Sequence, residues 1–131
     1  MSEIDDKELL KVIGDFIEMG HVENIVAMFK RDTSLYRFVG PLLQDERFAV
    51  RLGTAVLFEE LAQARPGEVE LAIPYLTPLL KDKTPWIRGE AANILVIINS
   101  TAALALLKPL TKDRDPQVAE IARDALQVSA N

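Results

Sequence analysis

The sequence contains no cysteine and only one histidine, and this composition excludes several kinds of site. Without cysteine there is no disulfide scaffold, no zinc site with thiolate ligands and no cysteine nucleophile. His21 lies in the turn-like stretch MGHVEN, where no second nitrogen or thiolate ligand is at hand to complete a metal site. We therefore expect His21 to have a turn or capping role, and we expect neither a metal nor a cofactor.

Long apolar runs and an excess of positive charge are also missing. Charged or polar residues interrupt every apolar stretch before the ~18 residues that a membrane span needs, and the first residues, MSEIDDKELL, are acidic where a secretory signal would be basic. The formal net charge of -5 opposes the attraction to phosphate that dominates nucleic-acid binding. The sequence thus predicts an acidic, cytoplasmic protein with neither membrane nor nucleic acid among its partners.

No catalytic arrangement is visible in the sequence. Serines occur only at positions 2, 34, 100 and 129, with no nucleophile elbow and no glycine-rich phosphate loop. The acidic pairs Asp5-Asp6 and Glu59-Glu60 are adjacent in sequence, so on a helix their carboxylates diverge by about 100°. We expect these carboxylates to be solvated, and we expect the protein not to be an enzyme.

Apolar residues recur at spacings of three and four through most of the chain, which is typical of α-helices with one buried stripe. The clearest stripe, in residues 85–98, consists of Ile87, Ala91, Ile94, Leu95 and Ile98. A second stripe, in residues 46–63, consists of Val50, Thr54, Leu57, Phe58 and Leu61. No run alternates convincingly with period two, so the sequence predicts an all-α fold of about eight helices.

Several predicted helix starts carry capping chemistry. Thr84-Pro85 and Asp115-Pro116 each place an oxygen-bearing side chain before a proline at the first helical position. Ser34 can cap the helix that follows it in the same way. Pro74 lies inside an apparent helix at 69–81, where we expect a kink or an opened first turn.

One short phrase occurs three times along the chain. PLLQDERFAVR begins at Pro41, PLLKDKTPWIR at Pro78 and PLTKDRDPQVA at Pro109, so the copies are offset by 37 and 31 residues. A helical hairpin of this size cannot bury its apolar face alone, so neighbouring hairpins must stack. We expect one domain over residues 1–131, an α-solenoid of about four stacked hairpins. Its expected divisions are an atypical N-terminal cap at 1–40 and repeat units at 41–67, 68–99 and 100–131.

These phrases resemble the HEAT-like repeat family of the PBS-lyase type, and the best match is LLKDKTPWIRGEAANIL, which begins at Leu79. The resemblance implies a ladder between adjacent units, formed by the Asp at each turn and the Arg on the following helix. The residues that would form this ladder here are Asp45, Asp82, Asp113, Arg51 and Arg88. Phe48 replaces the family's proline in the first copy, and Ala119 replaces the arginine in the last. The ladder should therefore stop at the C-terminal unit.

The resemblance also implies that the second helices of the hairpins line a concave face. The residues expected there are Trp86, Glu90, Asn93 and Ile97, with Val56 and Glu60 from the unit before and Ile121 and Asp124 from the unit after. An exposed tryptophan among aliphatic and acidic residues suits a protein-binding hot spot, because its ring supplies a large contact area at low entropy cost. Packing of Trp86 over the preceding turn is the alternative.

The leading hypothesis is a non-enzymatic scaffold or adaptor that binds a protein partner through this concave face. Relatives of the repeat type include phycobilin lyases and helical-repeat DNA glycosylases, so a bilin-lyase-like small-molecule-binding protein is one alternative, whereas the acidic charge argues against a glycosylase. A second alternative is a self-assembling homo-oligomeric module, in which case the protein would be a homodimer and not a monomer. The aromatic residues that would either fill the core or form such a seam are Phe16, Phe29, Tyr36 and Phe38.

Overall fold

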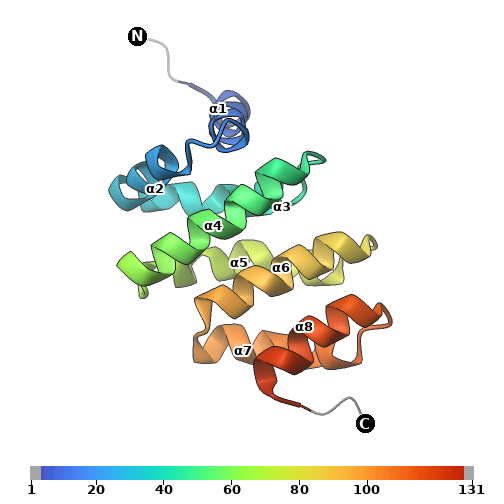
Figure 1. The fold of residues 1–131 in the computed structure, drawn as a ribbon. Helices are drawn as coiled ribbons and strands as arrows, with labels where there is room; N and C mark the ends of the chain where they lie inside the picture. The colour runs from blue at the N-terminus through green and yellow to red at the C-terminus, as the bar shows by residue number, and fades with distance from the viewer. Residues whose placement is uncertain (1–3, 129–131) are drawn as a thin grey trace.

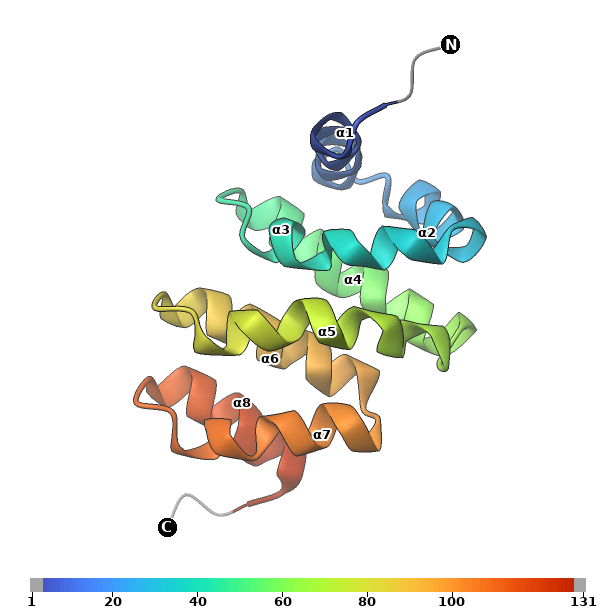
Figure 2. The ribbon, with the colours of Figure 1, turned by 180° about the vertical axis from the view of Figure 1, so that it is seen from behind.

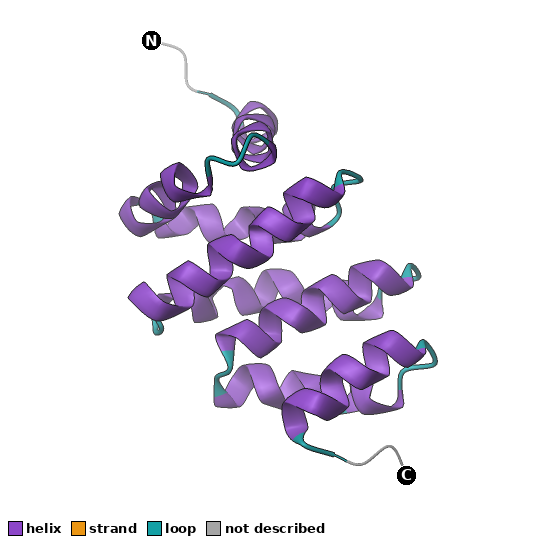
Figure 3. Cartoon of the chain, viewed as in Figure 1, coloured by secondary structure: helices purple, strands orange, loops and turns teal. Residues whose placement is uncertain are grey.

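The computed structural model describes residues 4–128, and within that range it contains eight α-helices, four short 3-10 helices and no strand. Figure 3 shows the helices joined by short loops. The predicted all-α class is confirmed, and the stacked hairpins in Figure 1 form the predicted α-solenoid.

Successive hairpins stack in two layers. One layer contains the second helix of each hairpin, namely α4 (Phe48–Ala64), α6 (Pro85–Ile98) and α8 (Pro116–Leu126). These helices lie side by side at the front of Figure 1, and α6 contacts both of the others. The other layer, at the front of Figure 2, contains α3 (Val39–Leu43), α5 (Ile73–Leu76) and α7 (Thr101–Leu107). We call them the second-helix layer and the first-helix layer.

The first-helix layer is built from short pieces. The region 69–81, which the sequence predicts as one kinked helix, divides into η2 (Glu68–Ala72), α5 and η3 (Thr77–Lys81). Pro74 and Pro78 have no backbone N–H, so a continuous α-helical hydrogen-bond ladder cannot pass through them. Short 3-10 turns continue the path on either side of α5.

The hairpin that contains α4 begins earlier than the first copy of the repeated phrase. Its first segment, η1 (Thr33–Phe38), runs directly into α3, so the division predicted after residue 40 lies inside one helical segment. Asp32 caps this segment, because its carboxylate accepts hydrogen bonds from both the backbone N–H and the hydroxyl of Ser34. The prediction that Ser34 is the cap is therefore wrong. In the last hairpin the order is reversed, and the 3-10 helix η4 (Pro109–Lys112) follows α7.

Helices α6 and α8 both begin at a proline, as the sequence predicts, but their caps differ. The Asp115 carboxylate accepts hydrogen bonds from the N–H groups of Gln117 and Val118, at 2.9 and 3.1 Å. Thr84 makes no side-chain cap; its own N–H donates to the carboxylate of Asp82 at 2.9 Å. The aspartate at the turn thus shapes the entry to α6.

The N-terminal pair, α1 (Asp6–Glu18) and α2 (Val22–Arg31), covers the first end of the stack. In Figure 1 α1 is seen end-on, so its axis crosses the helices of the second-helix layer. It comes close to α4 at Gly53, where an added Cβ would overlap the side chain of Ile17. His21 stands at the N-cap position of α2 without a side-chain hydrogen bond, and its ring lies 5.8 Å from that of Phe16.

The aromatic residues of the first third mainly fill the core. Phe29, Tyr36 and Phe58 are fully buried and meet edge to face, with ring centroids 5.2 to 6.5 Å apart. This is the geometry that aromatic pairs prefer. Phe38 is also buried, and Phe16 is partly buried against the same core. These rings therefore join α2, η1 and α4 within one chain.

Small side chains occupy one equivalent position in each second helix. Thr54, Ala91 and Ala122 are all fully buried, and the Thr54 hydroxyl is satisfied by donating to the carbonyl of Val50 at 2.8 Å. Close helix packing leaves little free volume at such positions. The repeated small residue therefore sets the spacing of the two layers.

Candidate functional site

A hollow of about 500 Å³ opens across the starts of α4, α6 and α8. We call it the Trp86 groove. All three helices of the second-helix layer contribute to it. Its lining includes Phe48, Arg51, Trp86, Glu90, Asn93 and Ile121. The groove thus crosses two junctions between hairpins.

Two aromatic rings and one guanidinium dominate this groove. Trp86 is 42% exposed and Phe48 is 63% exposed. The guanidinium carbon of Arg51 lies 4.3 Å from the centroid of the Trp86 ring and 5.5 Å from that of Phe48. A cation in this position is attracted to the ring face. Trp86 therefore contacts the preceding hairpin through Arg51 and still presents much of its ring to solvent.

Arg51 is held firmly in place by three polar partners. Its Nε donates to Glu90 Oε2 at 2.9 Å, and its Nη1 donates to the carbonyls of Asp45 and Glu46 at 2.8 and 3.0 Å. The Arg51 and Glu90 side chains are 15% and 25% exposed. Since the guanidinium is fixed, the Trp86 ring that it covers is also restrained.

At the next junction, Arg88 of α6 forms the expected kind of contact with the following unit. Its Nε and Nη2 donate to the two carboxylate oxygens of Asp113, both at 2.9 Å. Its Nη1 donates to the carbonyls of Asp82 and Lys83. The side chains of Arg88 and Asp113 are 6% and 8% exposed. The Arg88 guanidinium holds the pKa of the Asp113 carboxyl below its ordinary value.

The first junction departs from the ladder that the resemblance implies. Arg51 pairs with Glu90 and not with Asp82. The Asp82 carboxylate accepts from the N–H of Thr84, as the Asp113 carboxylate accepts from the N–H of Asp115. The two junctions differ at position 90, since the equivalent residue of α8 is the apolar Ile121. At the first junction the Glu90 carboxylate is the one that accepts from the arginine.

Asp45 takes part in a different contact, which joins the N-terminal pair to the stack. Its two carboxylate oxygens accept from Nε and Nη2 of Arg47 at 3.0 and 2.9 Å, and Nη1 of Arg47 donates to Asp15 and Glu18 on α1. Hydrogen bonds to these carboxylates, of which the one to Asp45 has the largest effect, hold the pKa of the Arg47 guanidinium above its ordinary value. At the other end of the chain Ala119 is buried and carries no charge to continue the ladder.

The eight residues expected on the concave face are divided among several places. Trp86, Glu90, Asn93 and Ile121 come together in the Trp86 groove. The other four lie elsewhere. Val56 and Glu60 face α2. Asp124 lies beside Ile121 in a separate hollow on α8, and Ile97 packs partly buried against the core.

Phe48 is the groove residue that sequence reasoning missed. It stands where the other two repeats have Pro85 and Pro116, and that departure from the repeat was the available signal. Phe48 is 63% exposed, so its ring is available at the surface of the groove. The sequence places Arg51 in the ladder, whereas the structure pairs it with Glu90 and sets its guanidinium over Trp86.

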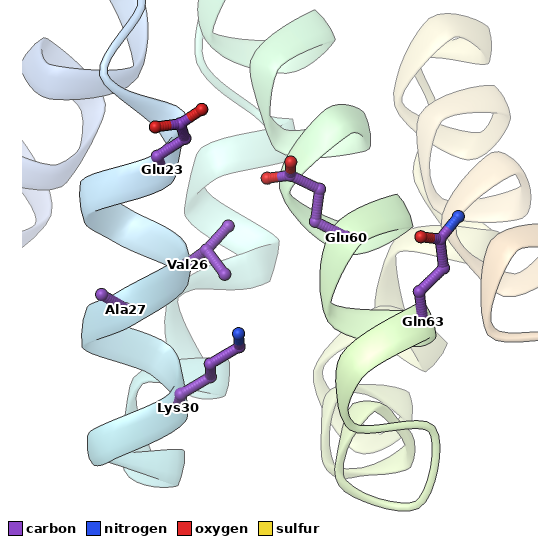
Figure 4. A pocket seen from close by; sticks show the side chains of 6 residues that line it. All are labelled: Glu23, Val26, Ala27, Lys30, Glu60 and Gln63. Carbon is purple, nitrogen blue, oxygen red and sulfur yellow. The ribbon is translucent and has the colours of Figure 1, made fainter.

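A second hollow, of about 430 Å³, separates α2 from α4. Figure 4 shows Glu23, Val26 and Lys30 of α2 facing Glu60 of α4 across it. Its lining has charged ends and no aromatic ring. Between residues 4 and 128 no group of histidine and carboxylate side chains is arranged to hold a metal ion. Because it has no aromatic ring, this hollow lacks the large apolar contact surface that Phe48 and Trp86 provide in the Trp86 groove.

Comparison with known families assigns the chain. A family model for HEAT repeats matches residues 36–127, and the chain belongs to the HEAT-repeat family. HEAT repeats commonly act as protein-interaction scaffolds, and the family is generally non-catalytic. The searches of curated proteins and of solved structures returned no match. Among the helices of residues 4–128, none combines the length and hydrophobicity that a membrane crossing requires.

Proposed function

We propose that this chain is a non-enzymatic scaffold that binds a partner protein in the Trp86 groove. The observation that carries the proposal is the pair of exposed rings, Trp86 and Phe48, held on two neighbouring helices with Arg51 between them. Aromatic and arginine side chains are enriched among the residues that dominate binding energy at protein interfaces.

The rigidity of the groove supports the same proposal. Binding costs free energy whenever flexible side chains must be ordered at an interface. Here Glu90 and two backbone carbonyls already fix Arg51, and Arg51 covers one face of Trp86. A partner would therefore meet a surface that is largely in its bound arrangement.

The test uses two exposed aromatic residues on opposite layers. Trp86→Ala removes the ring in the groove, and Tyr75→Ala removes a ring of similar exposure, 46%, from α5 in the first-helix layer. Affinity capture with wild type and both variants, followed by mass spectrometry, should show a partner that is lost with Trp86→Ala and kept with Tyr75→Ala. A photo-crosslinking residue at Asn93 should label that same partner.

Two results would contradict the proposal. Equal recovery of every captured protein by the wild type and Trp86→Ala removes the groove from consideration. Saturable binding of a bilin that Trp86→Ala abolishes, without a protein partner, would instead favour a small-molecule-binding role. Circular dichroism of both variants checks that the fold is kept, which is expected because neither residue belongs to the buried core.

A further inference from the structure

The second-helix layer changes chemical character from one end to the other. On α4 an apolar stripe, Phe48, Leu52 and Val56, is 63%, 54% and 41% exposed. The residues are four apart, so they lie on one face of the helix and extend over roughly 12 Å. The start of α2 adjoins the stripe at Val56, whereas Phe48 and Leu52 are each more than half exposed.

The corresponding positions become neutral on α6 and acidic on α8. On α6 they are Pro85, Gly89 and Asn93, and on α8 they are Pro116, Glu120 and Asp124. Glu120 and Asp124 are exposed and make no ion pair with any residue between 4 and 128. Both line a hollow of about 390 Å³ beside Ile121.

The nearby arginine of α8 does not neutralise this acidic end. Arg123 occupies the position of Ala55 on α4 and Ala92 on α6, which are buried where one hairpin meets the next. Arg123 therefore lies on the open end of the stack. Arg51, the cation of the groove, is already paired with Glu90.

Gly89 lies in the lining of the groove between the two ends. It has no side chain to fill the groove, and a Cβ there would be in ordinary van der Waals contact, at 3.8 Å, with Val118 and Ile121. Neighbouring helices lie about 8–10 Å apart, so α4 and α8 are separated by about 16–20 Å. An extended chain covers that distance in about five or six residues.

From this change between an apolar end on α4 and an acidic end on α8, we infer the chemistry of the segment that the partner protein places in the groove. This inference rests on the proposed function of the Trp86 groove. The segment is an extended stretch of a partner protein that crosses the three helices. One bulky apolar side chain contacts Phe48, Leu52 and Trp86, and lysine or arginine residues five or six positions away face Glu120 and Asp124. Charge complementarity selects the basic end, and apolar burial anchors the other.

The experiment begins with a defined probe. A phage-displayed library of random 12-residue peptides is selected on the full chain, and enriched peptides are synthesised and titrated against it. Trp86 is the single tryptophan of the chain, so its fluorescence reports binding in the groove directly. The enriched peptides should pair a bulky apolar residue with lysine or arginine at the stated spacing.

Charge reversal separates this inference from a general apolar preference. Glu120→Lys combined with Asp124→Lys should weaken binding of the selected peptide about tenfold at low salt and less at high salt. A matched reversal of two exposed acids away from the groove, Glu8→Lys with Glu70→Lys, should leave the affinity unchanged. Phe48→Ala should weaken binding at every salt concentration.

The outcomes distinguish the two levels of the argument. Peptides that need Trp86 but carry no basic residues, and that bind the Glu120→Lys, Asp124→Lys variant equally well, overturn this inference and leave the proposed function standing. Peptides that carry a fluorescent label and, by the anisotropy of that label, bind Trp86→Ala as well as the wild type overturn both. A dimer in sedimentation velocity that Phe48→Ala dissociates would make a second copy of the chain the occupant of the stripe, which also overturns the inference.

Discussion

The two junctions of the second-helix layer use the same repeat position for different purposes. Between α6 and α8, Arg88 and Asp113 form a two-point ion pair whose side chains are almost fully buried. Between α4 and α6, Arg51 is turned toward Glu90 and the exposed Trp86 ring. The first junction thus has a partly buried ion pair beside an exposed aromatic ring where the second has a buried ion pair.

The largest expected effect concerns the buried pair. Arg88→Met keeps the length of the side chain but leaves the Asp113 carboxylate buried without its partner, which should lower the free energy of unfolding by about 3 kcal/mol. Urea denaturation monitored by circular dichroism measures this change. The same substitution at the first junction, Arg51→Met, should lower it by about 1 kcal/mol or less, because that pair is partly exposed. Equal losses at the two sites would show that the junctions do not differ energetically.

The next prediction tests whether the spacing of the layers is as tight as the buried small residues indicate. Ala91→Leu inserts three carbon atoms at a fully buried position and should lower the free energy of unfolding by about 1 to 3 kcal/mol. Ala102→Leu makes the same change at an exposed position of α7 and should have little effect. An unchanged melting temperature for Ala91→Leu would contradict the equivalence of positions 54, 91 and 122.

Acid pH offers a further way to separate the two junctions. Arg88 lowers the pKa of Asp113 in the folded protein, so the contribution of this carboxylate is present above its unfolded pKa and is lost as the pH falls through the folded value. Across that range one proton changes the stability by about 1.4 kcal/mol per pH unit. The difference in stability between wild type and Arg88→Met should therefore shrink as the pH falls from 5 toward 2. A constant difference would mean that Asp113 does not depend on Arg88.

The fold could be predicted from the sequence because it depends on repetition and burial. The stripe from Ile87 to Ile98 and the three repeated phrases specify helices that must stack, and these are local patterns. The short 3-10 pieces of the first-helix layer were less predictable, since two prolines at 74 and 78 act together in that segment. The sequence thus predicts that the helices exist, but it does not predict where the first helix of each hairpin changes between α-helix and 3-10 helix.

The candidate site was only partly predictable because it depends on contacts between repeats. Trp86, Glu90, Asn93 and Ile121 were placed together by the alignment of the second helices. That alignment assigned Val56 and Glu60 to the same surface, whereas the N-terminal pair places α2 beside them. It also could not choose between Asp82 and Glu90 as the partner of Arg51, since both are one unit away and only side-chain geometry decides.

The smallest energetic effect should come from converting the first junction into the second. Glu90→Ile gives α6 the residue that α8 has at the equivalent position, 121, and removes the carboxylate that holds Arg51. Arg51 should then pair with Asp82 in the way that Arg88 pairs with Asp113, and the free energy of unfolding should change by less than about 1 kcal/mol. A crystal structure of the variant would show the new pair.

Trp86 provides the more sensitive measurement of that conversion. Once Arg51 has turned toward Asp82, its guanidinium no longer covers the indole, so the ring becomes more mobile and its fluorescence anisotropy should fall. Asn93→Ala, which alters the groove without touching Arg51, serves as the control and should leave the anisotropy unchanged. If Arg51 stays over Trp86 in Glu90→Ile, then attraction between the cation and the ring outweighs the ion pair, and the two junctions differ because of Trp86 and not because of Glu90.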